Sequence, residues 1–366
     1  VGAGFDAEWI TSLGREQFNS TTNGNTRYPV VADPDDLQVN QLYLVADGLV
    51  PHAALKIGRQ RIIWDDERFV GNVGFRQNEQ TFDALRATTD LIPQIELEYV
   101  YFDEVRRIFG DDSDVGSFDM NAHGIRSRLS GVPFVNLKPF ALLLDFENDA
   151  PGLSSATFGA LVDTDIALVE PWQLHFHGGL AYQEDYAENP DDFDLWYYVV
   201  EPGLSYDFVK ASLGFEVLEG DGASAFQTPL ATGHKFNGLT DQFLTTPPDG
   251  LRDLYLKLDL DIPGDGWRDD LTVPIEYHQF WAEDQGTHYG WEWSIGLFKT
   301  VPTDVGKVLL GVQYADYDAD NFAADTQKLW VTLQFILGPE PYRGLIDSIR
   351  RRQGAAVASG LRMATG

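Results

Sequence analysis

Apolar and polar residues alternate with a period of two along almost the whole of this 366-residue chain. In "LRDLYLKLDLDI" one face carries the leucines at 254, 256, 258 and 260, and the opposite face includes Asp253, Lys257 and Asp259. The stretches "WQLHFHGGLAYQ" and "YGWEWSIGLF" alternate in the same way. Successive side chains of a β-strand point to opposite sides of a sheet, so the pattern predicts strands with one apolar and one polar face.

The alternating segments number about sixteen and are long, at about 9–12 residues each, whereas ordinary globular strands average about 5–6. Short connections such as "SGVP" alternate with long polar ones such as "QEDYAENPDDFD". Short turns at one rim and long loops at the other are typical of outer-membrane barrels. We therefore expect an all-β fold, a transmembrane antiparallel up-and-down β-barrel over residues 1–337, in a bacterial outer membrane. The expected strands span 5–12, 37–47, 53–64, 80–89, 94–106, 117–129, 134–147, 155–168, 172–184, 194–207, 208–218, 251–261, 271–283, 289–300, 306–316 and 326–337.

A soluble β-sandwich, β-helix or propeller would also show alternation. A soluble sheet needs a second sheet over its apolar face, which shortens and roughens the pattern, and no repeat of 20–50 residues suggests a propeller or solenoid. No run of about 18 apolar residues is present, which excludes a transmembrane helix. The barrel is the favoured interpretation.

The chain is strongly acidic, with a formal net charge of -31 and a pI near 4.3. Such a charge argues against a nucleic-acid partner, because a phosphate backbone would be repelled. The absence of cysteine excludes disulfides and thiol chemistry. No cofactor is expected.

Positive charge is concentrated in one part of the chain. Residues 56–138 hold 11 of the 26 Lys+Arg and 14 of the 57 Asp+Glu, a net charge of only -3. A charged side chain at the lipid midplane costs roughly 2–4 kcal/mol, so these side chains are expected to face the lumen. Guanidinium groups in a narrow lumen bind carboxylate or phosphate groups and select for anions. The expected pore-lining, anion-binding residues are Arg59, Arg61, Arg86, Arg126, Arg128 and Lys138.

Two alternatives stay open for these residues. The arginines can pair with acids such as Asp65, Glu79 and Glu98 and brace the wall instead of binding a solute. Leu55 and Ile57 also share strand parity with Arg59 and Arg61, unless a bulge near Gly58 resets the alternation.

The segment 219–250 is long and lacks clear alternation. Connections of this length are usually functional or disordered. We expect a loop that folds over or into the pore, with His234 and Lys235 as constriction residues, and the alternative is a mobile surface loop.

Metal binding has only weak support. Asp316, Asp318 and Asp320 resemble the start of an EF-hand loop, but Asn321 and Gln327 stand where its glycine and terminal glutamate belong, so a solvated acidic surface is the stronger interpretation. His175 and His177 share a face, and without a third ligand they are interpreted as polar wall.

The tail 338–366, "GPEPYRGLIDSIRRRQGAAVASGLRMATG", changes to a basic and potentially helical composition. As a C-terminal extension it could plug the periplasmic mouth, contact a periplasmic partner or be disordered, and disorder is the default for a terminus.

The block "LKIGRQRIIWDDERFVGNVGFRQNEQTFDALR" at 55–86 resembles the alginate-export family of outer-membrane barrels and its porin-like relatives. "VNQLYL", "YVYFDEVRRIFG" and "HKFNGLTDQFLTTPPDGLRDLY" support the resemblance, which spans nearly all of residues 5–335. It implies a closed barrel with an electropositive lumen, commonly of 18 strands in the exporter itself. Relatives usually carry two strands ahead of the segment that matches "GFDAEWI", so we expect about 16–18 strands.

The favoured function is a passive channel in outer-membrane lipid for anionic or polar solutes. The resemblance implies an acidic polysaccharide such as alginate, a polyuronate, as the solute. A structural or adhesive barrel with an occluded lumen is the alternative. An embedded lipase or deacylase needs a Ser/His/carboxylate set on one wall, and no G-x-S-x-G signature appears, so no enzyme is expected. A soluble glycosidase would use a pair of carboxylates, but sequence spacing cannot identify such a pair in a chain with so many acidic residues.

Overall fold

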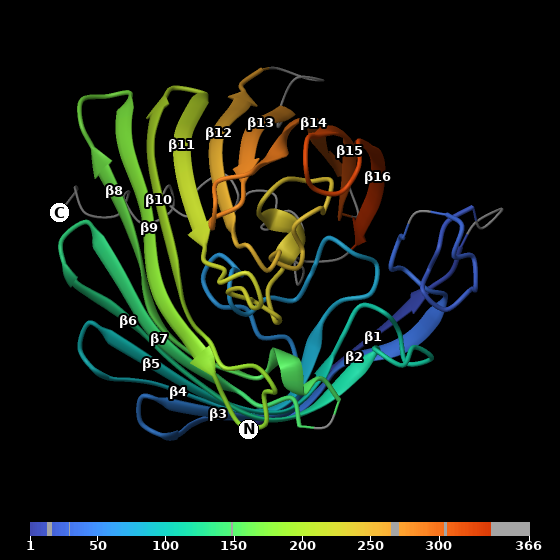
Figure 1. Ribbon diagram of the computed structural model, residues 1–366. Coiled ribbons are helices and arrows are strands. Elements are labelled where there is room, and N and C mark those ends of the chain that lie inside the picture. The colour runs from blue at the N-terminus through green and yellow to red at the C-terminus, as the bar shows by residue number, and fades with distance from the viewer. Residues whose placement is uncertain (13–16, 29, 148, 265–270, 304–305, 338–366) are drawn as a thin grey trace. The chain divides into compact units, whose positions relative to one another are not determined.

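The structure is a computed structural model that describes residues 1–12, 17–28, 30–147, 149–264, 271–303 and 306–337. It contains sixteen strands (Figure 1). Two short 3-10 helices, η1 (Pro151–Leu153) and η2 (Gly233–Lys235), lie in long connections. The strands are β1 (Gly2–Ile10), β2 (Asp36–Val50), β3 (Ala53–Gln60), β4 (Thr81–Ile92), β5 (Ile95–Arg106), β6 (Ser117–Val132), β7 (Val135–Leu144), β8 (Ser155–Ala167), β9 (Trp172–Asp185), β10 (Asp194–Tyr206), β11 (Val209–Leu218), β12 (Leu251–Ile262), β13 (Leu271–Trp281), β14 (His288–Thr303), β15 (Gly306–Ala319) and β16 (Thr326–Leu337).

The strands form one sheet in sequence order, from β1 to β16. Neighbours are antiparallel within β1–β7 and within β10–β16. Each of the sixteen predicted segments corresponds to one of these strands. The clearest boundary error is in β3, which ends at Gln60 although the prediction extended it to residue 64.

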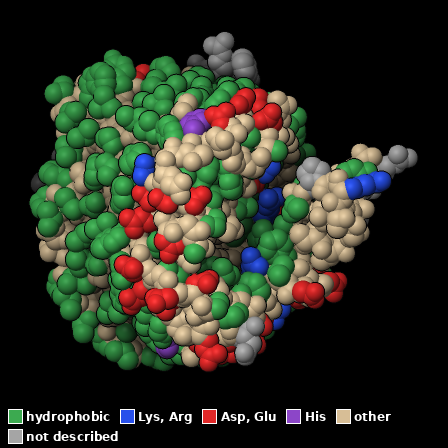
Figure 2. Space-filling model, viewed as in Figure 1, with side chains coloured by type: hydrophobic (Ala, Val, Ile, Leu, Met, Phe, Trp, Pro, Cys, Tyr) green, Lys and Arg blue, Asp and Glu red, His purple; other side chains and the backbone are tan. Residues whose placement is uncertain are grey.

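The two faces of the strands differ in character, as the alternation predicted. On β12, the exposed fractions are 39% for Leu254 and 51% for Leu256, whereas Asp253 is fully buried and Tyr255 is 6% exposed. Hydrophobic side chains gather over strands such as β5 and β6 (Figure 2). We call the face of exposed hydrophobic side chains the apolar face and the opposite one the polar face. Within the described ranges, no helix has both the length and the apolar character needed to cross a membrane.

The chain divides into two compact units. Unit 1 comprises Val1–Leu161, Leu180–Trp196 and Phe226–Gly233, and unit 2 comprises Val162–Gly179, Tyr197–Ala225 and the chain from His234 onward. The long segment 219–250 therefore contributes to both units. The C-terminal extension 338–366, with its predicted periplasmic contact, lies outside the described residues.

Candidate functional site

Arg59 has the strand parity of the exposed hydrophobic side chains of β3. It is paired in register with Leu42, which is 60% exposed, and it has the same strand parity as Ile57, which is 51% exposed. Its guanidinium lies 2.8 Å from Asp83 on β4. Gly58 has a left-handed φ of 113°, but it does not turn Arg59 to the polar face. The register therefore assigns Arg59 to the apolar side of β3, in an ion pair with Asp83, and a pore-lining role for it remains a prediction.

Arg61 lies beyond the end of β3 and points the other way. Its guanidinium binds Glu79 at 2.5 Å and lies 3.7 Å from Asp6 on β1. Asn72 also donates to Glu79, at 2.9 Å. Because the strand ends before Arg61, the alternation that governs Arg59 does not apply to it.

Arg86 and Arg126 lie on the polar face and share one carboxylate. Arg86 on β4 and Arg126 on β6 both bind the Oε2 atom of Glu98 on β5, at 2.9 and 3.0 Å. The Oε1 atom of Glu98 accepts the indole N–H of Trp64 at 2.9 Å. Glu98 is only 6% exposed, so three donors compensate for its removal from water.

Asp65 is a second carboxylate around which basic side chains gather. One of its oxygens lies 3.4 Å from Arg126, 3.7 Å from Arg128 and 3.5 Å from Lys138 on β7. Four of the six predicted basic residues thus meet in one place, which we call the arginine cluster: Arg86, Arg126, Arg128 and Lys138.

The arginine cluster borders a pocket of about 470 Å³ in unit 1. The acids Asp47, Asp65, Asp90, Glu96 and Glu98 also line it, together with His52, Arg86, Arg126, Arg128 and several small or apolar residues. The bracing alternative is therefore correct in part, because these arginines have carboxylate partners. The pocket is polar and mixed in charge rather than purely basic.

Part of the positive charge remains available to a ligand. The Arg128 side chain is 45% exposed, and its contacts with Asp65 and Glu96 are loose, at 3.7 and 3.6 Å. A planar anion with two oxygens matches the fork of a guanidinium, so this pocket can accept a carboxylate or phosphate.

The connection 61–80 holds Asp65 in place, and its role was not predicted. Trp64 is buried against the wall, and the rings of Phe69 and Phe140 lie 4.3 Å apart. The backbone N–H of Gly71 donates to Leu230 at 2.8 Å. The apolar run "RIIWDDERFV" looks like strand continuation, and only its two adjacent acids signal a turn.

The part of segment 219–250 that belongs to unit 1 is also attached to this site. The Thr232 hydroxyl donates to Glu67 at 2.5 Å, and the Gln80 amide donates to the Leu230 carbonyl at 3.0 Å. Gln227 and Gln183 exchange hydrogen bonds at 2.9 Å. These contacts argue against a freely mobile loop.

The part that belongs to unit 2 contains the two predicted constriction residues. His234 is 6% exposed and binds Asp241 at 2.5 Å, and Lys328 on β16 binds the other oxygen of Asp241 at 2.7 Å. Burial alone would raise the pKa of Asp241, but these two cations outweigh it and hold that pKa well below its usual range. Asp241 therefore links the segment to β16 through Lys328, and the His234 ring lies edge-on to Trp330 of the same strand. Lys235 is half-buried in η2.

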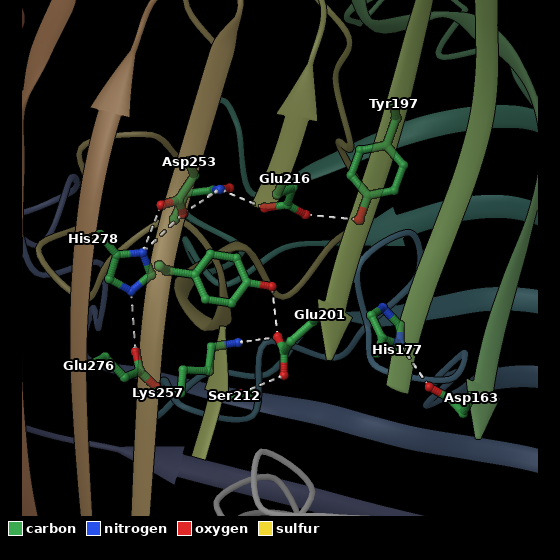
Figure 3. A network of polar contacts seen from close by, with 12 residues as sticks. Asp163, His177, Tyr197, Glu201, Ser212, Glu216, Asp253, Lys257, Glu276 and His278 are labelled. Carbon is green, nitrogen blue, oxygen red and sulfur yellow. Dashed lines mark hydrogen bonds and ion pairs between the residues drawn. The ribbon is translucent and has the colours of Figure 1, made fainter. Parts of the chain in front are cut away.

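Several acidic side chains of unit 2, including Glu201, Glu216, Asp253 and Glu276, lie in a network of polar contacts (Figure 3). Glu216 and Asp253 lie directly opposite each other on β11 and β12, and the Asn237 amide donates to both, at 2.7 and 3.1 Å. His278 lies 3.0 Å from Asp253. Glu201 accepts hydrogen bonds from Tyr255 at 2.7 Å and from Lys257 at 3.1 Å.

The structure gives no support to a calcium site at Asp316, Asp318 and Asp320. Asp316 and Asp318 lie within β15 rather than in a loop, and Asp320 binds His288. In the described part of the chain, no group of three His, Cys, Asp or Glu side chains could hold a metal ion.

Solved structures of outer-membrane proteins resemble this one. OccK1 (OpdK) of Pseudomonas aeruginosa has a TM-score of 0.68 and 16% identity, with 86% of this chain and 82% of that chain covered. OpdL of the same organism has a TM-score of 0.64 and 16% identity, covering 84% of each chain. OccAB2 of Acinetobacter baumannii has a TM-score of 0.63 and 16% identity, covering 82% and 79%. No protein-family model and no curated protein matches the sequence.

These structures show that the chain has the fold of outer-membrane porins, an all-β fold of up-and-down antiparallel strands. The predicted fold is confirmed, and the predicted location agrees with it because this fold is one of bacterial outer membranes. The porin-like part of the family resemblance is supported, whereas membership of the alginate-export family remains a prediction.

Proposed function

We propose that this protein is an outer-membrane channel through which small anionic or polar solutes diffuse passively, and that the pocket beside the arginine cluster selects them. The observation that carries the proposal is the meeting of Arg86, Arg126 and Arg128 around one pocket on the polar face of unit 1. Guanidinium groups on a water-filled path attract anions and bind them in a bidentate fork.

The mixed charge of the pocket favours a small solute with a single acidic group. Arg128 is the most exposed member of the arginine cluster, and Asp65 and Glu98 already neutralise part of the charge behind it. A solved OpdK structure with vanillate, a small aromatic carboxylate, covers 78% of this chain at a TM-score of 0.62 and 17% identity. We infer that a solute of this kind fits the pocket of this chain.

The resemblance to alginate-export barrels extends the proposal to an acidic polysaccharide. A polyuronate presents the same carboxylate chemistry, repeated along a chain. The arginine cluster could therefore serve either solute, and a direct comparison of the two decides between them.

Single-channel recording in planar bilayers tests the proposal. Vanillate added to the wild-type protein should produce brief, concentration-dependent current blocks, and Arg128→Gln should shorten them because one guanidinium fork is lost. Arg59→Gln is the matched control and should leave the blocks unchanged, because Arg59 lies on the apolar face. Blocks by a polyuronate alone would favour the polysaccharide. A protein that inserts but carries no current would favour a structural barrel with an occluded lumen.

A further inference from the structure

Three side chains on the polar face of unit 2 stand in the arrangement of a catalytic triad. The Oδ1 atom of Asp165 on β8 lies 2.6 Å from Nδ1 of His175 on β9, and Nε2 of His175 lies 2.9 Å from the hydroxyl of Ser205 on β10. The carboxylate and the hydroxyl therefore contact opposite nitrogens of one imidazole. The sequence analysis treated His175 only as polar wall.

The direction of these hydrogen bonds follows from the donors and acceptors present. An ionised carboxylate can only accept, so Nδ1 of His175 carries a hydrogen and donates it to Asp165. In neutral His175, Nε2 then has a lone pair that accepts the Ser205 hydroxyl hydrogen. This is the tautomer that a general base needs to remove a proton from a serine.

The three residues are accessible to a solute. Asp165 lies near the end of β8, His175 near the start of β9 and Ser205 next to the last residue of β10, so they lie close to the short connections. The Asp165 side chain is 38% exposed and that of His175 is 13% exposed. Ser205 is half-buried.

The neighbourhood of Ser205 offers charge stabilisation. Lys210 on β11 is paired in register with Ser205, so the two side chains share a face and lie side by side. Its ammonium group is suited to stabilise negative charge on an oxygen next to Ser205. Gly203 shares the same face, and a Cβ atom there would lie 3.1 Å from Ser212 and 3.6 Å from the Cβ atom of His175, so the missing side chain lets these residues approach closely.

We propose that Ser205, His175 and Asp165 form a site for acyl transfer that hydrolyses small carboxylic esters entering the polar side of the barrel. The Ser205 oxygen forms a bond to the ester carbonyl carbon while its proton passes to Nε2 of His175. The tetrahedral intermediate then breaks its bond to the alcohol oxygen, and the alcohol leaves with that proton. A water molecule, activated by His175 in the same way, releases the carboxylic acid and restores Ser205.

This activity goes beyond the proposed channel function and does not depend on the arginine cluster, which belongs to unit 1. The chain supplies its own matched control. His177 lies two residues further along β9 and binds Asp163 at 2.7 Å (Figure 3). Ser212 on the same face donates to Glu201 rather than to a histidine.

The test uses the full chain refolded in detergent. A fluorophosphonate probe should label Ser205, as identified by mass spectrometry of the modified peptide, and the protein should hydrolyse p-nitrophenyl acetate. Ser205→Ala should abolish both, and His175→Gln should slow both by about a hundredfold or more, the usual contribution of a general base. His177→Gln and Ser212→Ala should keep wild-type rates.

Bilayer conductance of each variant confirms that the barrel has folded and separates this proposal from the channel proposal. Labelling of Ser205 that requires His175 supports the proposal even if the channel conducts poorly. Absence of labelling in a conducting wild-type channel, or equal loss of rate in the variants of His175 and His177, would overturn it.

Discussion

Arg86 and Arg126 lie on two strands separated by β5, and both bind the same oxygen of the carboxylate on the strand between them, Glu98. Two guanidinium groups thus converge on one carboxylate, and other acids that line the same pocket offset their remaining charge. A second acid, Asp65, reaches Arg126 from the connection 61–80. The charge of the pocket is therefore set by a few identifiable ion pairs, each of which can be altered separately.

Glu98→Gln should increase the anion selectivity of the channel. The substitution removes one negative charge beside Arg86 and Arg126 and keeps an oxygen that can accept the Trp64 indole N–H. One unit charge about 5 Å away in water is worth about 0.8 kcal/mol, or about a fourfold change in local anion concentration. Reversal potentials in a KCl gradient measure this, and a shift toward cation selectivity would contradict it.

Gly124→Val should displace the connection 61–80 from the wall. A Cβ atom on Gly124 would lie 2.7 Å from the Trp64 ring and 3.1 Å from Leu142. Overpacking of this kind costs roughly 1–3 kcal/mol, and release of the connection should enlarge the conductance.

The double variant Gly124→Val, Trp64→Ala isolates the steric cause of that effect. If the clash with Trp64 is responsible, adding Gly124→Val to Trp64→Ala should change the unfolding free energy much less than adding it to wild type. Equal effects of Gly124→Val in both backgrounds would show that Trp64 is not the residue displaced.

Attachment of the segment around Asp241 should persist in moderately acidic solution. The pKa of this carboxyl is lower in the folded protein than its ordinary 3.8, because the neighbouring His234 and Lys328 outweigh the effect of burial. A depressed folded pKa gives stability that is fully present above pH 3.8 and declines as the pH falls from there toward the folded value.

Asp241→Asn tests this contribution. Hydrogen exchange of residues 234–241 at pH 5 should be slow in wild type and faster in the variant. Asp221→Asn is a suitable control, because Asp221 is an exposed carboxyl of the same segment that accepts hydrogen bonds from the backbone N–H groups of Ala223 and Ser224. Unchanged exchange in Asp241→Asn would show that other contacts hold the segment.

Leu256→Lys should destabilise the protein folded in lipid. Leu256 lies in the middle of β12 on the apolar face and is 51% exposed. A lysine near the bilayer midplane costs about 2–4 kcal/mol. Urea unfolding in lipid vesicles measures the loss, with Leu256→Ala as the control for lost side-chain area. A lysine variant as stable as the alanine variant would argue that this face does not meet lipid.

The strands could be predicted from sequence because each one alternates on its own. Leu254 and Leu256 face one side and Asp253 faces the other for purely local reasons of backbone geometry. The end of β3 could not be predicted, since Ile62 and Trp64 continue an apolar pattern although they are buried by tertiary contacts.

The site was only partly predictable for a related reason. Composition located the basic part of the chain, but the acids that bind Arg126 and Arg128 come from β5 and from the connection 61–80. Likewise, Asp165, His175 and Ser205 lie on three strands, and only the register between those strands brings them together. Register depends on pairing between strands across the sheet, and the alternation within a single strand does not determine it.

The measurement that most directly tests the channel account is the reversal potential of the wild-type protein in a KCl gradient, compared with that of the triple variant Arg86→Gln, Arg126→Gln, Arg128→Gln. The account predicts that the wild type passes chloride more readily, relative to potassium, than the triple variant does, and that Arg59→Gln behaves as wild type. Identical reversal potentials for the wild type and the triple variant, with both channels open, would contradict it.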